Sequence, residues 1–181
     1  MNFFELIESR HSCRAFQEAV VEKEKLQLIL DAIDQAPSAG NLQAYAVKVV
    51  TNNDTKEKLT SLAFGQDFIR QAPLVLVFFS VPDLSAKKYG DRGRFLYCIQ
   101  DATIACTYAQ LAATDLGLAS CWVGAFDVWA VERCLKADWP WRAIAMLPIG
   151  YAETPLTSPP KVSRVELSTT HDPEGSGLVR L

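Results

Sequence analysis

The chain has 181 residues, of which 49% are hydrophobic, and a formal net charge of −3 at pH 7. This length supports one well-buried core, and the slightly acidic balance argues against a broad phosphate-binding surface, so nucleic acid is not an expected partner. The longest apolar run, residues 72–81, is too short to cross a membrane, and the N-terminus lacks the pattern of a signal peptide, so we expect a cytoplasmic protein with no membrane partner.

The first half of the chain predicts a helix, a strand and a second helix. Apolar residues recur at helical spacing over residues 22–36, and a proline and a glycine follow as stop signals. Residues 44–51 are rich enough in β-branched and aromatic side chains to form a strand. Asn52 then begins a short helix that we expect to reach residue 63.

A buried strand and a long helix are predicted in the middle of the chain. Residues 73–79 are apolar at both odd and even positions, which is typical of a central strand covered on both faces. Residues 95–116 predict a helix with two apolar stripes, one of which carries the small side chains of Ala102, Cys106, Ala109 and Ala113. Those small residues allow another backbone to approach closely. The pattern is equally compatible with packing against a symmetry mate and with a single helix crossing the domain core.

The last third of the chain predicts a strand, a helix, a strand and a tail. We expect a strand over residues 119–126 that is broken by Gly124, a helix over 128–135 and a strand over 144–151. After residue 152 the sequence becomes rich in proline and polar residues. We therefore expect one domain over residues 1–152 and an extended tail over 153–181.

Two polar turns flank the first predicted helix and carry most of the hydrogen-bonding side chains of interest. Residues 9–14 read S-R-H-S-C-R and are cationic, whereas residues 36–43 read A-P-S-A-G-N-L-Q and are neutral. Such a pair could hold the two chemically different ends of a phosphorylated cofactor. Alone, the arginines would be solvated surface residues, and the second turn would be an ordinary helix stop.

The familiar catalytic sets are absent from the sequence. There is no G-x-S-x-G elbow, no G-x-G-x-x-G and no Walker phosphate loop, and the two histidines and five cysteines lack metal-ligand spacing. We therefore expect no metal site and no catalytic side chain acting by itself. Where a bound cofactor performs the chemistry, the protein needs only to orient it and to tune its electronic properties.

Several segments of the sequence resemble motifs of the FMN-dependent nitroreductases. Five segments match in the family's order, although each match is weak alone. The family's S-R-R-S-x-R-x-F resembles residues 9–16, its A-P-S-x-x-N-x-Q resembles 36–43, and its Q-D-x-x-x-A resembles 100–105. Its L-G-L-x-x-x-W-x-G-x-F and P-x-G-Y resemble 116–126 and 148–151. The resemblance implies an α+β fold with three α/β/α layers around a central mixed sheet.

The resemblance also implies FMN as cofactor, bound between the two subunits of a homodimer whose C-terminal extensions are exchanged. The residues that would bind FMN come from four segments of the chain. They are Arg10, His11, Ser12 and Arg14; Pro37, Ser38, Asn41 and Gln43; Val123 and Gly124; and Lys161 and Arg164. The arginines would hold the phosphate and the N1 side of the ring, the neutral turn would come from the partner subunit, and the Val123-Gly124 backbone would face flavin N5.

The expected activity is that of an FMN-dependent NAD(P)H oxidoreductase. By resemblance, NAD(P)H would reduce the flavin and leave, and a nitroaromatic, quinone or similar electron-poor acceptor would then take its place in a ping-pong cycle. His11 stands where the family has a second arginine, and Ala44-Tyr45 where it has Pro-Trp or Pro-Phe. These departures leave open an alternative, a flavin-binding or storage module with little turnover.

Overall fold

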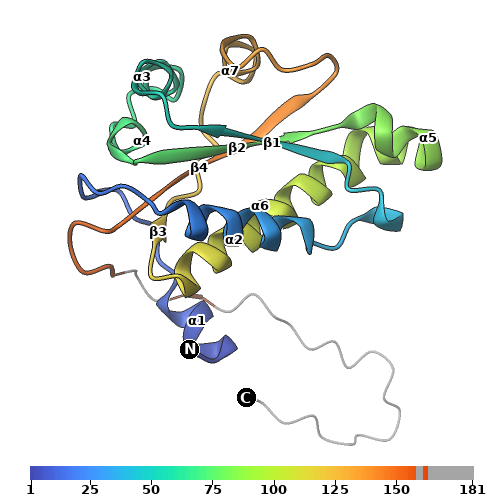
Figure 1. The fold of residues 1–181 in the computed structure, drawn as a ribbon. Helices are drawn as coiled ribbons and strands as arrows, with labels where there is room; N and C mark the ends of the chain where they lie inside the picture. The colour runs from blue at the N-terminus through green and yellow to red at the C-terminus, as the bar shows by residue number, and fades with distance from the viewer. Residues whose placement is uncertain (158–160, 163–181) are drawn as a thin grey trace, which may run out of the picture.

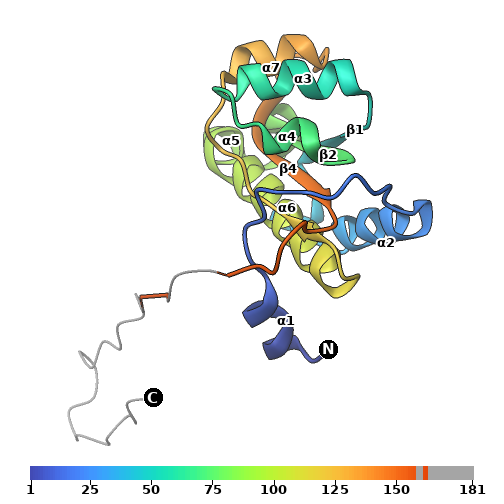
Figure 2. The ribbon, with the colours of Figure 1, turned by 90° about the vertical axis from the view of Figure 1, so that its left-hand side faces the viewer.

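In the computed structural model, which describes residues 1–157, 161 and 162, a four-stranded sheet lies between two layers of helices (Figure 1). Helices α3, α4 and α7 cover one face, and α2 and α6 cover the other. Helix α1 projects from the layers in both views (Figures 1 and 2).

The helices are α1 (Phe3–Ser9), α2 (Lys23–Asp34), α3 (Asn53–Leu62), α4 (Phe68–Gln71), α5 (Pro82–Arg92), α6 (Cys98–Asp115) and α7 (Val128–Cys134), with a 3₁₀ turn η1 (Ala39–Asn41) and a π-turn η2 (Gly93–Tyr97). The strands are β1 (Tyr45–Val50), β2 (Leu74–Ser80), β3 (Ala119–Ser120) and β4 (Arg142–Gly150).

The sheet has the strand order β1-β2-β4-β3, and its neighbouring strands pair antiparallel. Strand β2 is buried along its whole length and sends alternate side chains into two separate cores, because successive residues of a strand point to opposite faces. Thus Phe78 packs with α2 and α6, and Phe79 packs on the α3 and α7 side. The expected α+β class is confirmed. Parallel pairing within the described residues is limited to one bridge, between Ser12 and Ser120.

The predicted strand over residues 119–126 is much shorter in the structure, and its partner strand explains why. Strand β3 ends at Ser120, although Val123 exchanges two further hydrogen bonds with Met146 of β4, of 2.9 and 3.0 Å. Opposite the break stands Pro148, which accepts a bond from the Cys121 N–H but has no N–H to return. The interruption therefore comes from Pro148, not from Gly124 as expected.

Helix α6 settles the question that its two apolar stripes raised. The small side chains of this stripe, including Cys106, Ala109 and Ala113, are fully buried against α2 and the sheet. The small-residue stripe therefore packs inside the domain, the second of the two alternatives. The other stripe stays half-buried or exposed, with Tyr108 36% exposed. The predicted helix over 95–116 is also divided, because its first residues form the π-turn η2.

The structure adds helices α1 and α5 to the elements predicted above. Helix α1 is a short amphipathic segment before the cationic turn, but none of its residues is buried, and its apolar residues Phe3 and Phe4 are exposed. Helix α5 is mainly polar and includes Gly90 with a non-helical backbone, so its sequence has no apolar periodicity that would predict it.

Candidate functional site

The two polar turns lie near opposite ends of α6 (Figure 1). At the start of this helix, Asp101 binds the neutral turn. After its end, β3 pairs with the cationic turn. An α-helix rises about 1.5 Å per residue, so the 18 residues of α6 span about 27 Å. The structure therefore keeps the two turns of one chain well apart.

The cationic turn is held on the protein by its backbone. Helix α1 ends at Ser9, Ser12 forms the bridge with Ser120, and the N–H of Cys13 donates to the carbonyl of Ser120 at 2.9 Å. The buried side chain of Phe16 anchors the following residues. This pairing leaves the side chains of Ser12 and Arg14 exposed.

The charges of this turn gather around a buried thiol. Burial raises the pKa of Cys121, while the nearby guanidinium groups of Arg14 and Arg10 and the Ser12 hydroxyl oppose that rise. Within the described residues, neither arginine forms an ion pair with a carboxylate. The buried Ser120 hydroxyl also has no hydrogen-bond partner there. This end of the site therefore offers unneutralised cations and an unused hydroxyl.

The other two members of the turn, His11 and Cys13, differ in setting from the arginines. His11 is half-buried next to Ser12. Cys13 is 1% exposed, its thiol donates to the carbonyl of Ala15 at 3.1 Å, and burial raises its pKa. A buried thiol with a raised pKa is a poor nucleophile, so Cys13 serves packing in this turn.

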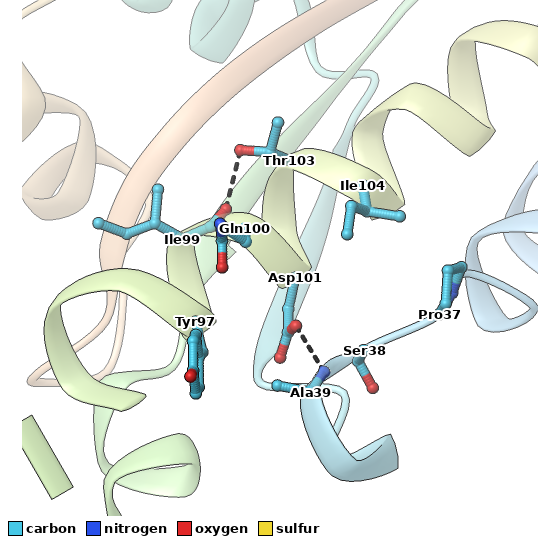
Figure 3. Close-up of a pocket in the computed structure, with 9 residues that line it drawn as sticks. All are labelled: Pro37, Ser38, Ala39, Tyr97, Ile99, Gln100, Asp101, Thr103 and Ile104. Carbon is cyan, nitrogen blue, oxygen red and sulfur yellow. Dashed lines mark hydrogen bonds between the residues drawn. The ribbon is translucent and has the colours of Figure 1, made fainter. Parts of the chain in front are cut away.

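The neutral turn depends on one buried carboxylate. Asp101 is 2% exposed and accepts a hydrogen bond from the N–H group of Ala39 at 2.9 Å (Figure 3). It also accepts one from the N–H group of Ala44 at 3.4 Å. The Ser38 hydroxyl accepts from the N–H of Gln43 at 2.9 Å. Gly40, like Asn41 and Gln43, has a positive φ, which L-residues rarely adopt. The turn is thus a tightly specified loop with the side chains of Asn41 and Gln43 exposed.

A hollow of about 510 Å³ lies between this turn and the start of α6 (Figure 3). The structure places the predicted Pro37 and Ser38 on one side of it. On the other side it adds Tyr97 and Gln100, which the sequence did not single out. Gln100 belongs to a matched motif, so a signal for it existed, whereas Tyr97 belongs to none of the five.

Helix α5 closes over the neutral turn. A Cβ atom built on Gly40 would collide with the hydroxyl of Tyr89 and lie 2.6 Å from Nζ of Lys88. The rings of Tyr89 and Tyr97 meet edge to face at 5.1 Å. A cation and two phenols therefore border the turn, and no sequence signal identified them because α5 itself was not predicted.

The backbone N–H groups of Val123 and Gly124 differ in whether they are already hydrogen-bonded. The N–H of Val123 is used by Met146, whereas that of Gly124 makes no hydrogen bond with any described residue. A side chain at Gly124 would come near only Trp122, whose Nε1 would lie 3.5 Å from the added Cβ. The exposed Gly124 is therefore the residue that leaves its backbone donor accessible.

The remaining candidates lie in or beyond the last described residues. Lys161 is exposed, and Arg164 lies outside the described residues. In the part of the chain that the structure describes, no group of acidic, histidine and cysteine side chains could hold a metal ion. Over the same residues, no helix is long and apolar enough to cross a bilayer.

Comparison with known proteins places this arrangement in a family. The model of the Nitroreductase family matches residues 7–66 and 60–151. A putative NADH dehydrogenase/NAD(P)H nitroreductase of Methanothermobacter thermautotrophicus is 29% identical over 162 residues, covering 87% of this chain and 81% of that protein. The FMN reductase [NAD(P)H] of Bacillus subtilis is 32% identical over 125 residues, or 63% of this chain and 50% of the relative, so the chain spans about half of its length.

A solved structure agrees with the sequence matches. A nitroreductase family protein of Clostridium difficile 630 is 33% identical, has a TM-score of 0.77, and is matched over 87% of this chain and 88% of its own. The family model covers most of the chain, including both polar turns. The chain therefore belongs to the nitroreductase family.

Proposed function

We propose that this chain is an FMN-dependent oxidoreductase that takes electrons from NAD(P)H and reduces electron-poor acceptors such as nitroaromatics and quinones. The observation that carries the proposal is the pair of complementary half-sites, one cationic and one neutral, near the two ends of α6. Membership of the nitroreductase family and the names of the relatives support the cofactor and the reductant.

The cationic half-site fits the phosphate of FMN. Arg10 and Arg14 have no carboxylate partner among the described residues, and a guanidinium offers paired donors that match phosphate oxygens. Ser12 is exposed beside them, and the unpartnered Ser120 hydroxyl lies beneath. The proposed roles of these residues are to bind the phosphate and to place positive charge near the N1 side of the ring.

The neutral half-site fits the ring and the ribityl chain. The exposed Asn41 and Gln43 and the Ser38 hydroxyl offer neutral hydrogen-bonding groups beside the hollow that Pro37 lines. The N–H of Gly124, which makes no hydrogen bond with any described residue, is the proposed donor to the flavin ring edge. When bound, FMN would supply hydride transfer in a ping-pong cycle, and these residues would orient it and exclude water.

A homodimer is part of the proposal, because the two half-sites of one chain lie near opposite ends of α6, a helix about 27 Å long. Each pocket would combine the cationic turn of one subunit with the neutral turn of the other. The exposed Phe3, Phe4 and Tyr108 provide apolar surface for such an association. Residues 1–152 would form the flavin-binding domain, and residues 153–181 would extend over the partner and bring Lys161 and Arg164 to the phosphate.

A second candidate is a flavin-binding module with little turnover. It is favoured by His11, a half-buried imidazole where the family has an arginine. This substitution removes the permanent positive charge of a guanidinium from the cationic half-site. Flavin could then be held without being tuned for rapid reduction.

One experiment tests both candidates. The purified protein is reconstituted with FMN, its absorbance spectrum is recorded, and NADH or NADPH is added without oxygen. We expect a yellow protein that bleaches within seconds and regains its colour when a quinone is added. Failure to retain FMN would refute both functions, and a persistently yellow protein would favour the storage module.

A further inference from the structure

A second hollow, of about 430 Å³, lies between the ends of β2 and β4 and the π-turn η2. Its apolar lining includes Phe95, Ile99 and Trp139. It shares Ile99 with the hollow beside the neutral turn but none of the proposed FMN-binding residues. It is therefore a separate candidate site at the same end of the domain.

The walls of this hollow expose large aromatic side chains. Phe95 is 68% exposed and Trp139 is 79% exposed, although both are large and apolar. Contact with these side chains would stabilise a bound aromatic ring, because planar rings stack or meet edge to face while they exclude water. The walls thus favour a planar ring over a branched aliphatic group.

A buried hydroxyl in the lining lacks an effective partner. Ser80 lines the hollow and is 1% exposed, yet its Oγ makes no hydrogen bond of normal geometry with any described residue. The Cys98 thiol lies near it, and a thiol is a weak hydrogen-bonding group. Buried hydroxyls are rarely left in this state, so a ligand oxygen is a suitable partner.

Two guanidinium groups complete the polar part of the lining. Arg94 binds Asp83 at 2.6 Å, and Arg142 binds Glu132 at 3.2 Å while its guanidinium carbon lies 3.9 Å from the Trp129 ring centroid. Each guanidinium has five N–H donors, so one such contact leaves several unused. Neither carboxylate lines the hollow, so its charged lining is entirely cationic.

We propose that this hollow binds a planar aromatic acid, at a site distinct from the flavin site. Its ring would pack on Phe95 and Trp139, and its carboxylate would accept hydrogen bonds from Arg94 and Arg142. An oxygen substituent on the ring would pair with Ser80. Aromatic walls, fixed cationic donors and a buried hydroxyl together match this chemistry.

The test uses 4-hydroxybenzoate, titrated into the full chain by isothermal calorimetry. We expect saturable binding of one molecule per chain. Phenol lacks the carboxylate and cyclohexanecarboxylate lacks the planar ring, so both should bind at least about tenfold more weakly. No binding, or equal binding of all three compounds, would overturn the proposal, including the case in which a second subunit fills the hollow.

Matched variants separate the ligand contacts from structural effects. Arg94→Gln should weaken binding at least about tenfold, whereas Asp83→Asn breaks the same ion pair but keeps the guanidinium and should retain it. Ser80→Ala should weaken binding, and Ser85→Ala, which also removes a buried unpartnered hydroxyl but does not line the hollow, should not. Equal losses within either pair would contradict the assignment.

The flavin provides an independent check. FMN content and the unfolding midpoint should stay unchanged in the Arg94 and Ser80 variants, because neither residue belongs to the proposed flavin site. If 4-hydroxybenzoate displaces FMN instead, the binding belongs to the flavin site and the proposal is wrong. A protein that fails to bind FMN but binds 4-hydroxybenzoate would refute the proposed oxidoreductase alone.

Discussion

The two polar turns near the ends of α6 are built in opposite ways. The cationic turn is held by backbone pairing, through the Ser12–Ser120 bridge and the bond from Cys13 to Ser120. The neutral turn is held by a side chain, the buried carboxylate of Asp101, which accepts from two backbone N–H groups across 62 and 57 residues of sequence. The fold of the cationic turn should therefore tolerate changes in its side chains, whereas the fold of the neutral turn should depend on Asp101.

This difference has a consequence for ligand binding. The cationic turn is stabilised by backbone hydrogen bonds, so replacing a side chain such as Arg14 should change FMN affinity without changing the fold. The neutral turn is stabilised by one carboxylate, so removing that carboxylate should change both the fold and the FMN affinity. Five predictions, in order of expected effect, probe this contrast.

The largest effect is expected for Asp101→Ala. This change leaves the N–H groups of Ala39 and Ala44 without their charged acceptor, and hydrogen bonds to charged groups contribute about 1.5–3 kcal/mol each. We expect the free energy of unfolding to fall by about 2–4 kcal/mol in urea titration. Asp115→Ala, an exposed change at the other end of α6, is the control and should be nearly neutral. Similar losses in both variants would remove the special role of Asp101.

Arg14→Ala should affect FMN and not the fold. Loss of one charge-assisted contact of about 1.5–3 kcal/mol predicts a ten- to hundred-fold weaker FMN affinity by fluorescence titration, with an unchanged unfolding midpoint. Arg70→Ala, an exposed arginine on α4, serves as the control. Unchanged affinity in the Arg14 variant would exclude this residue from the site.

Gly40→Ala separates backbone strain from crowding. Gly40 and Gly117 both have positive φ, of 58° and 75°, where an L-residue costs about 1–2 kcal/mol. Only at Gly40 would the added Cβ meet other atoms, those of Lys88 and Tyr89. We expect Gly40→Ala and Gly117→Ala to lose similar stability by thermal unfolding, but only Gly40→Ala to weaken FMN binding. Equal FMN affinity would place α5 outside the site.

The smallest effect concerns the thiols of the cationic half-site. Burial raises the pKa of Cys13 and Cys121, so in the folded protein both stay protonated at a pH where an exposed thiol begins to ionise. Iodoacetamide at pH 8 should therefore modify the partly exposed Cys134 first, as followed by peptide mass spectrometry. Early modification of Cys13 would show that the turn opens.

The raised pKa values of Cys13 and Cys121 predict the direction in which stability changes with pH. A group with a raised folded-state pKa binds more protons when folded than when unfolded once the pH passes its unfolded pKa. For a thiol whose unfolded pKa is about 8.5, stability is retained below that value and is lost as the pH rises above it. Cys13→Ala should reduce this alkaline loss, and a loss of unchanged size would indicate that other groups cause it.

Much of the fold could be predicted from local patterns. Helix α2 and strand β2 lie where the apolar spacing placed them, because alternation and helical periodicity directly reflect which face is buried. Helix α5 was missed, since a polar helix with an internal glycine carries no such pattern. Strand β3 was overextended because its break originates in Pro148, a residue of the neighbouring strand.

The sequence by itself determined the two polar turns, their charges, the buried strand and the nearly complete set of family motifs. These features depend on residue types at short spacing, which fix local backbone preference and burial. Only the tertiary structure decided that Asp101 holds the neutral turn, that α5 covers Gly40, and that the two turns lie near opposite ends of α6, a helix about 27 Å long. Such contacts join residues far apart in the chain, and their geometry arises from packing of whole elements, which local spacing does not encode.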